Sequence, residues 1–175
     1  MPEIPADLVA TELPRRLLEL WPKFLSFFIS FWIVGLNWTA HHRIFHYIRG
    51  YDRRLLLINL LFLMWVALMP FLGSLLGEYG GQQLSVVFYA GHMIVVSLTL
   101  SWLWRHASRD QRLVDPSLDP DARRYTDLRV LAVPFVFLLS IAISFVNVNA
   151  AEYSWLLLFL VRPVLLRYME RDRRS

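Results

Sequence analysis

The side chains most able to carry out chemistry are histidines that lie at the ends and centres of apolar stretches. The densest polar group is the run 37–46, in which His42 and His46 are four residues apart and share one helical face. Two imidazoles at this spacing can ligate a metal, but no carboxylate or thiol accompanies them, so we expect no metal site. A proton-sensing role fits the ordinary histidine pKa of ~6.5 better. Structural hydrogen bonding within a helical bundle fits better still.

A second polar side chain lies at a matching depth in the next apolar stretch. Asn59 is about one turn inside the stretch that begins at Leu55. In an antiparallel pair of helices it would be level with Trp38 and His41 on the preceding helix. An asparagine in hydrocarbon seeks a partner on another helix. We therefore predict a structural polar network of Trp38, His41 or His42, and Asn59.

His92 stands near the middle of the apolar stretch 84–104. An ionisable residue at membrane depth is a candidate functional site, so His92 is a possible intramembrane polar site. A neutral histidine that bonds to a carbonyl on the next helix is the interpretation that we favour.

No motif for enzymatic chemistry accompanies these residues. The sequence shows no acyl-transfer triad, paired carboxylate site, phosphate-binding glycine loop or zinc motif, and it contains no cysteine. No carboxylate lies inside an apolar stretch, which argues against a carboxylate-based proton relay. We expect a protein that is not an enzyme and that binds no cofactor.

The elements that must position the polar residues are long apolar helices. Hydrophobic residues make up 57% of the chain, and the mean hydropathy is +0.44. A helix needs ~20 apolar residues to cross the hydrocarbon layer. Five stretches are candidates, at about 24–42, 55–76, 84–104, 130–151 and 153–168. The sequence thus predicts an all-α membrane protein, a helical bundle with five transmembrane helices in this chain.

Arginines occur in alternate links between these stretches. They are frequent in 43–54, in 105–129 and in the tail, whereas 77–83 and 147–152 contain no Lys or Arg. This is the positive-inside pattern, so we expect these arginine-rich loops and the C-terminus to be cytoplasmic in a multi-pass protein of the bacterial plasma membrane. Attraction to anionic lipid accounts for the net charge of +4 without a nucleic-acid partner.

The same pattern divides the chain into three parts. We expect an amphipathic, extracellular N-terminal segment at 1–22, a transmembrane domain at 23–170 with a cytoplasmic loop at 105–127, and a cytoplasmic tail at 171–175. Pro70 should kink the second span near its outer end. With the C-terminus in the cytoplasm, five spans place the N-terminus outside the cell, which is unusual for a chain without a signal peptide. A sixth span upstream of Met1 would resolve the difficulty.

Several short motifs follow one another in a recognisable order. They are Trp21–Phe27, Asn37–Phe45, Arg53–Leu60, Pro70-Phe71 and Leu76–Tyr79. This succession resembles the bacterial members of the transmembrane-protein-175 potassium channel family, also known as domain of unknown function 1211. The order of the His-His-Arg, Asn-Leu and Pro-Phe pieces carries the resemblance, since no single piece is specific.

The resemblance implies a six-helix protomer that assembles as a homotetramer in the lipid bilayer and conducts K⁺ ions. In that family the first helix lines the pore and carries an Arg-x-x-x-Phe-Ser-Asp motif, against which polar residues of the next two helices dock. Here those positions would be Trp38, His41 or His42, and Asn59.

The chain departs from the family at this helix. Phe-Ser-Asp does not occur, and no apolar span precedes Phe24. We therefore expect a potassium-preferring cation channel subunit that conducts passively through a central pore, incomplete without its pore helix. The alternative is a non-conducting membrane scaffold or interaction subunit derived from the same family.

Overall fold

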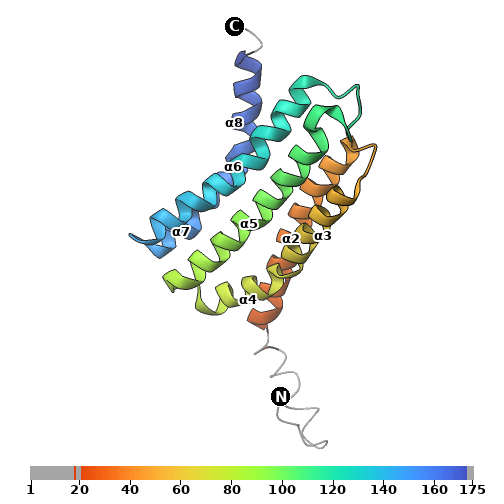
Figure 1. The fold of residues 1–175 in the computed structure, drawn as a ribbon. Helices are drawn as coiled ribbons and strands as arrows, with labels where there is room; N and C mark the ends of the chain where they lie inside the picture. The colour runs from red at the N-terminus through yellow and green to blue at the C-terminus, as the bar shows by residue number, and fades with distance from the viewer. Residues whose placement is uncertain (1–17, 19–20, 173–175) are drawn as a thin grey trace, which may run out of the picture.

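A computed structural model describes residue 18 and residues 21–172 of the 175-residue chain. These residues form helices joined by loops, with one isolated antiparallel bridge between Ile48 and Val114. The helices, in the labels of Figure 1, are α2 (Trp21–Tyr47), α3 (Arg53–Ala67), α4 (Met69–Tyr79), α5 (Gln83–Ser108), the 3₁₀ turn η1 (Arg109–Gln111), α6 (Pro120–Ser144), α7 (Val148–Ser154) and α8 (Leu157–Asp172).

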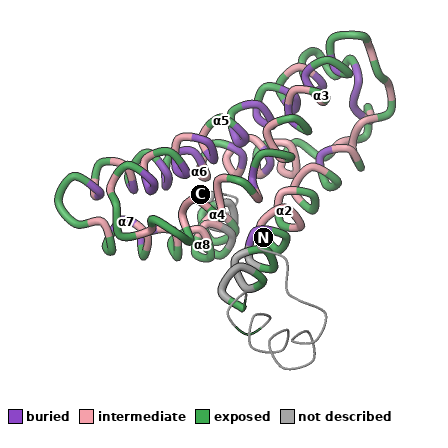
Figure 2. The backbone as a smooth tube through the Cα atoms, turned by 90° about the horizontal axis from the view of Figure 1, so that it is seen from below, coloured by how far each residue is buried: buried purple, intermediate pink, exposed green. Residues whose placement is uncertain are grey.

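Helix α5 forms the centre of the bundle. In its most apolar stretch 61% of the residues are buried, against 22% in α3–α4 and 28% in α6. Figure 2 shows buried residues concentrated along α5. Helices α3 and α4 pack on one side of α5 and α6 on the other, while α2 packs on α4 and α8 on α6. Because α5 contacts both groups, it holds the two halves of the bundle together.

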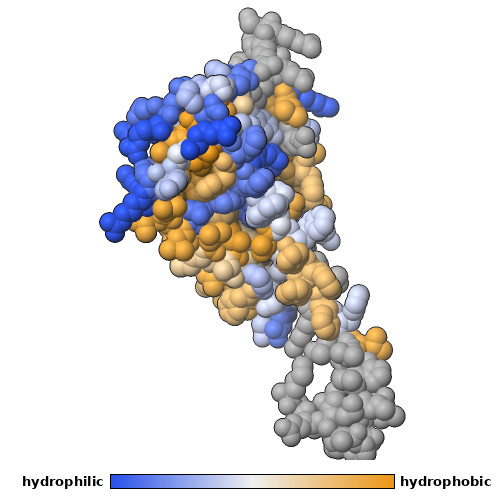
Figure 3. Space-filling model, turned by 90° about the vertical axis from the view of Figure 1, so that its right-hand side faces the viewer, coloured by the Kyte–Doolittle hydropathy of each residue, from blue (hydrophilic) through white to orange (hydrophobic). Residues whose placement is uncertain are grey.

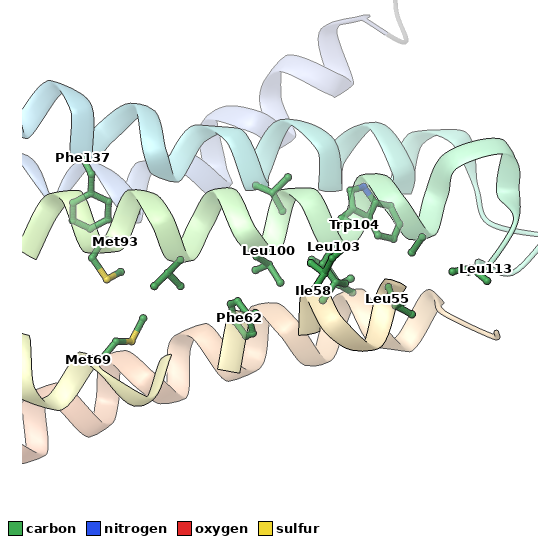
Figure 4. Close-up of a cluster of buried hydrophobic side chains, with 14 of the residues drawn as sticks. Leu55, Ile58, Phe62, Met69, Met93, Leu100, Leu103, Trp104, Leu113 and Phe137 are labelled. Atoms are coloured by element: carbon green, nitrogen blue, oxygen red, sulfur yellow. The ribbon is translucent and has the colours of Figure 1, made fainter. Parts of the chain in front are cut away.

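The core is a continuous seam of large apolar side chains between these helices. Ile58 and Phe62 of α3 face Leu100 and Leu103 of α5 (Figure 4), and all four are buried. Phe137 extends the seam onto α6. Burying such side chains stabilises a fold by about 1.5–3 kcal/mol each in water, and in lipid their close packing contributes instead of water exclusion.

The outer surface of the bundle is also apolar. Phe31, Trp32, Phe135 and Phe159 are each at least 65% exposed. On the face drawn in Figure 3, hydrophobic residues cover the middle of the bundle and hydrophilic residues gather toward its upper end. A surface of this kind needs lipid as its solvent, so the chain is a multi-pass membrane protein.

Three helical segments in the described part are long and apolar enough to cross a membrane, Arg53–Tyr79, Gln83–Gln111 and Pro120–Ser144. They correspond to the second, third and fourth predicted spans and confirm an all-helical membrane bundle. Val148–Val161 forms a shorter apolar helix. The first predicted span corresponds to α2, which is 27 residues long.

The second span breaks next to its proline. Helix α3 ends at Ala67, and α4 begins at Met69 with Pro70 in its first turn. Proline lacks the N–H that would continue the hydrogen-bond ladder, so the helix divides there. The amide of Leu68 instead donates to the carbonyl of Trp65 at 3.2 Å.

Some helices extend past the expected membrane boundaries. Within the cytoplasmic loop expected at 105–127, α5 continues to Ser108 and α6 begins at Pro120. Asp119 caps α6 by accepting a hydrogen bond from the amide of Asp121 at 3.2 Å. The span expected at 130–151 ends at Ser144, and Asn147 caps the separate helix α7.

The last predicted segments also differ from the structure. The fifth span, expected at 153–168, corresponds to α8, which begins at Leu157 and continues through Pro163 to Asp172. The tail expected at 171–175 therefore starts within a helix. Most of the N-terminal segment expected at 1–22, and residues 173–175, lie outside the described residues.

Two loops that are distant in sequence meet at one end of the bundle. The amides of Arg49 and Gly50 donate to the carbonyl of Leu113 at 2.8 and 3.1 Å, and the amide of Asp115 donates to that of Tyr47 at 2.9 Å. We call this end, formed by loops 48–52 and 109–119, the arginine end. It fixes where α3, the helix that carries Asn59, begins relative to α5.

Candidate functional site

His41 of α2 and Asn59 of α3 form the central pair of the candidate site. Nε2 of His41 lies 2.7 Å from Oδ1 of Asn59. An amide oxygen only accepts hydrogen bonds, so Nε2 carries the proton in this pair. The imidazole is stacked between Phe45 and Phe62, at centroid distances of 4.3 and 5.1 Å. The two rings fix the plane of His41 and thereby aim it at Asn59.

Trp38 and His42 form a second pair on the exposed side of α2. Their rings are stacked 5.2 Å apart with an interplanar angle of 16°. Both residues are exposed, and Trp38 is 60% accessible. Of the predicted network, the structure thus joins His41 to Asn59 and Trp38 to His42.

A pocket of about 180 Å³ lies beside Asn59, between the end of α2 and the start of α3. Its lining is mainly apolar, with Asn59 and Arg49 as the polar side chains. The lining residues are Phe45, Ile48, Arg49, Gly50, Tyr51, Leu55, Leu56 and Asn59. Asn59 therefore has a partner inside the bundle and also faces an open space.

Helix α2 approaches α4 closely on the N-terminal side of its histidines. Nδ2 of Asn37 donates to the carbonyl of Ile33 at 3.0 Å and contacts the sulfur of Met69 at 3.8 Å. Gly73 lies against Ser30, where a β-carbon on the glycine would overlap the serine hydroxyl. Small residues permit such close helix contacts in membranes.

His92 is buried in α5, with 7% of its surface exposed. A backbone hydrogen bond joins it to Trp65 on α3, and its ring meets the Trp65 ring edge-on at 6.0 Å. Its Nε2 has no hydrogen-bond partner among the described residues. The carbonyl of Trp65 lies at the α3–α4 break. His92 therefore contacts α3 at the point where the second span divides.

Asp52 connects the arginine end to α3, a role that the sequence analysis missed. Its Oδ1 accepts from the amide of Leu55 at 2.7 Å and so caps α3. Nε2 of His106, at the end of α5, lies 3.0 Å from both carboxylate oxygens, and Arg112 pairs with Oδ2. The bond from the Leu55 amide, followed by His106 and Arg112, holds the pKa of the Asp52 carboxyl below its usual range. An aspartate directly before an apolar helix is an N-cap signal that could have identified it.

Asp115 forms a second anchor at the arginine end. Its Oδ1 accepts from the hydroxyl and the amide of Ser117, and Nε of Arg49 donates to Oδ2 at 3.0 Å. The bonds from Ser117, with Arg49, lower the pKa of the Asp115 carboxyl from 3.8 to about 2. Both anchors carry charged groups outside the apolar part of the bundle.

The described residues contain no group of three or more His, Asp or Glu side chains that could hold a metal ion. The polar residues instead bond to one another, to backbone carbonyls and across helices. Such a site can position helices and polar groups.

Comparison with known proteins places the chain in a family. Residues 2–70 match the family model of the endosomal/lysosomal potassium channel TMEM175. The chain is 32% identical over 131 residues to a potassium channel of Streptomyces collinus, a match that covers 73% of this chain and 64% of the relative. It is also 32% identical over 139 residues to a potassium channel of Chamaesiphon minutus, covering 78% of this chain and 68% of the relative. The match to the first relative thus spans less than two thirds of that protein's length.

The fold is similar to a solved structure of the same kind. The lysosomal potassium-selective channel TMEM175 homologue from Chamaesiphon minutus matches with a TM-score of 0.65 and 28% identity, over 93% of this chain and 83% of that one. The order of motifs, the helical bundle and these matches lead to one conclusion: the chain belongs to the TMEM175 family, a family of ion channels and not of enzymes.

Proposed function

We propose that this chain is a subunit of a potassium-preferring cation channel, which conducts passively through the central pore of a homotetramer. The observation that carries the proposal is the structural match over 93% of the chain to a channel described as potassium-selective. In this proposal the channel is in the bacterial plasma membrane, with the arginine end in the cytoplasm. A hydrophobic constriction in the pore would gate by dewetting.

The His41–Asn59 pair has a positioning role in this proposal. It joins α2 to α3 at 2.7 Å, and the pocket beside Asn59 leaves that amide open to a further helix. A pore helix that carries Arg-x-x-x-Phe-Ser-Asp, as the family resemblance implies, would dock there. The exposed Trp38–His42 stack would then contact that helix or a neighbouring subunit.

Potassium flux from liposomes tests the proposal. The chain is reconstituted alone and, in parallel, fused behind a helix with the Phe-Ser-Asp motif, and K⁺ efflux is compared with Na⁺ efflux. We expect K⁺-preferring flux from the fused chain. Native mass spectrometry verifies that both forms are tetramers. If neither form then shows K⁺ flux, the channel proposal is wrong.

The second candidate is a non-conducting scaffold or interaction subunit. The exposed Trp38–His42 stack on α2 favours it, because exposed aromatic rings of this kind can contact another subunit. Tetramers of the chain that show no K⁺ flux and that co-purify with a full-length relative would support the scaffold function and not the channel function.

A further inference from the structure

Glu152 is half-buried and lies at the end of the bundle opposite the arginine end. It belongs to α7, which lies between the span formed by α6 and the helix α8 (Figure 1). Its Oε1 is buried and has no hydrogen-bond partner among the described residues. An ionised carboxylate in such a place lacks the donors that it would have in water, which is costly.

The neighbour of this oxygen is the turn between α4 and α5. A β-carbon on Gly80 would lie 3.4 Å from Oε1 of Glu152 and 2.8 Å from the carbonyl oxygen of Leu76. Oε1 of Glu152 thus packs against the turn at ordinary contact distance. The Leu76 carbonyl of the same turn accepts hydrogen bonds and cannot stabilise a negative charge.

The charges around Glu152 also favour the neutral acid. Glu78 and Tyr79, at the end of α4, are the ionisable residues of the turn. Tyr89 is the ionisable residue in the first two turns of α5, and the last turns of α6 carry none. On α7 itself the only other ionisable residue is Tyr153. The C-terminal end of α4 adds the negative end of a helix dipole. Burial raises the pKa of the Glu152 carboxyl.

We propose that Glu152 is a proton-binding site, whose protonated carboxyl group holds α7 against the α4–α5 turn and whose ionised form must leave that position for water. The equilibrium is the addition of one proton to one carboxylate, and it involves no other reactant. The proposal holds whether or not the chain conducts ions.

The position of α7 is coupled to the core through Trp155, three residues after Glu152. Nε1 of Trp155 donates to the hydroxyl of Ser140 at 2.7 Å, and its ring packs on Tyr89 and Phe137 at 5.2 and 5.8 Å. Release of Glu152 would therefore loosen the contact of α7 with α5 and α6. Trp155 serves as a natural reporter of that change.

Infrared difference spectroscopy of the full chain in phosphatidylcholine nanodiscs tests the proposal. At about pH 6 an ordinary glutamate is ionised, so a carbonyl stretch of a protonated acid that disappears on alkalinisation should be visible in the wild type. It should be lost in Glu152→Gln and kept in Glu78→Gln, which changes an exposed glutamate at the same end. A Glu152→Gln spectrum identical to that of the wild type overturns the proposal, because the carboxyl is then ionised or bound to a cation.

A second variant and a second measurement keep the test independent of folding. Glu152→Asp shortens the side chain by one methylene and should draw the carboxyl group away from the turn, so that the acid band disappears at a lower pH than in the wild type. The part of the tryptophan emission that Trp155→Phe removes should shift with alkaline pH in the wild type and stay constant in Glu152→Gln. An equal shift in both proteins contradicts the link between Glu152 and α7.

Discussion

Nε2 of His106 lies 3.0 Å from both carboxylate oxygens of Asp52, although the two residues are 54 positions apart. The same carboxylate caps α3 through the amide of Leu55. The beginning of α3 is therefore tied to the end of α5 by a single side chain. Because α3 carries Asn59, this tie also sets the height at which Asn59 meets His41.

Asp52→Asn should lower the thermal unfolding midpoint of the protein in detergent. Asparagine caps helices as well as aspartate does, so the substitution keeps the cap and removes the charge that faces Arg112 and His106. Asp119→Asn is the matched control, since Asp119 caps α6. Equal midpoints for Asp52→Asn and the wild type would show that the ionic contacts contribute nothing measurable.

Acid should weaken the arginine end. The folded pKa of Asp115 is about 2, below its ordinary value of 3.8, and that of Asp52 is also lowered. A carboxyl with a depressed folded pKa stabilises the fold above its unfolded pKa and loses that contribution as pH falls through the folded pKa. Thermal midpoints measured from pH 5 downward should therefore drop between about pH 4 and pH 2. Asp115→Asn should reduce the drop, and an unchanged acid profile in this variant would contradict the assignment.

The pair His41–Asn59 should show a measurable coupling energy. Asn59→Leu leaves the N–H of His41 without its acceptor between two phenylalanine rings. Hydrogen bonds between membrane helices contribute about 0.6–2 kcal/mol, and we expect coupling in this range from a double-mutant cycle with His41→Leu. His42→Leu is the matched control, and its cycle with Asn59→Leu should give no coupling. The opposite result would mean that His42 is the partner of Asn59 in the membrane.

This pair also shows how far the sequence could predict the site. The common depth of His41 and Asn59 follows from counting residues into two antiparallel apolar stretches. Which histidine faces α3 depends on the rotation of α2 about its axis, and α2 has apolar residues on every side. The rotation is set by packing against α4, including the contact between Gly73 and Ser30, which involves residues with no distinctive pattern.

The arginine end could be predicted only in part. Asp52 and Asp119 each stand before a helix, and the cap signals were present in the sequence. The partners of Asp52 lie more than 50 residues away, His106 in the last turn of α5 and Arg112 in the loop that follows. The first turns of α6 are polar, so hydropathy does not mark them, and the signal for them is Asp119-Pro120. The break at Leu68, in contrast, could be anticipated from Pro70 alone.

Gly73→Ala should destabilise the contact between α2 and α4. The added β-carbon would overlap the hydroxyl of Ser30 and lie 3.3 Å from its β-carbon, and Ser30 is only 3% exposed. A buried serine side chain is too short to move aside, so the helices must separate, at a cost of about 1–3 kcal/mol for such overpacking. Ser30→Gly removes both contacting atoms and should restore much of the loss when combined with Gly73→Ala. Gly35→Ala is the control, because a β-carbon there meets no atom within 4 Å. Thermal unfolding midpoints are measured for the wild type, Gly73→Ala, Gly35→Ala and the double variant. An unchanged midpoint for Gly73→Ala would contradict the close approach of α2 and α4.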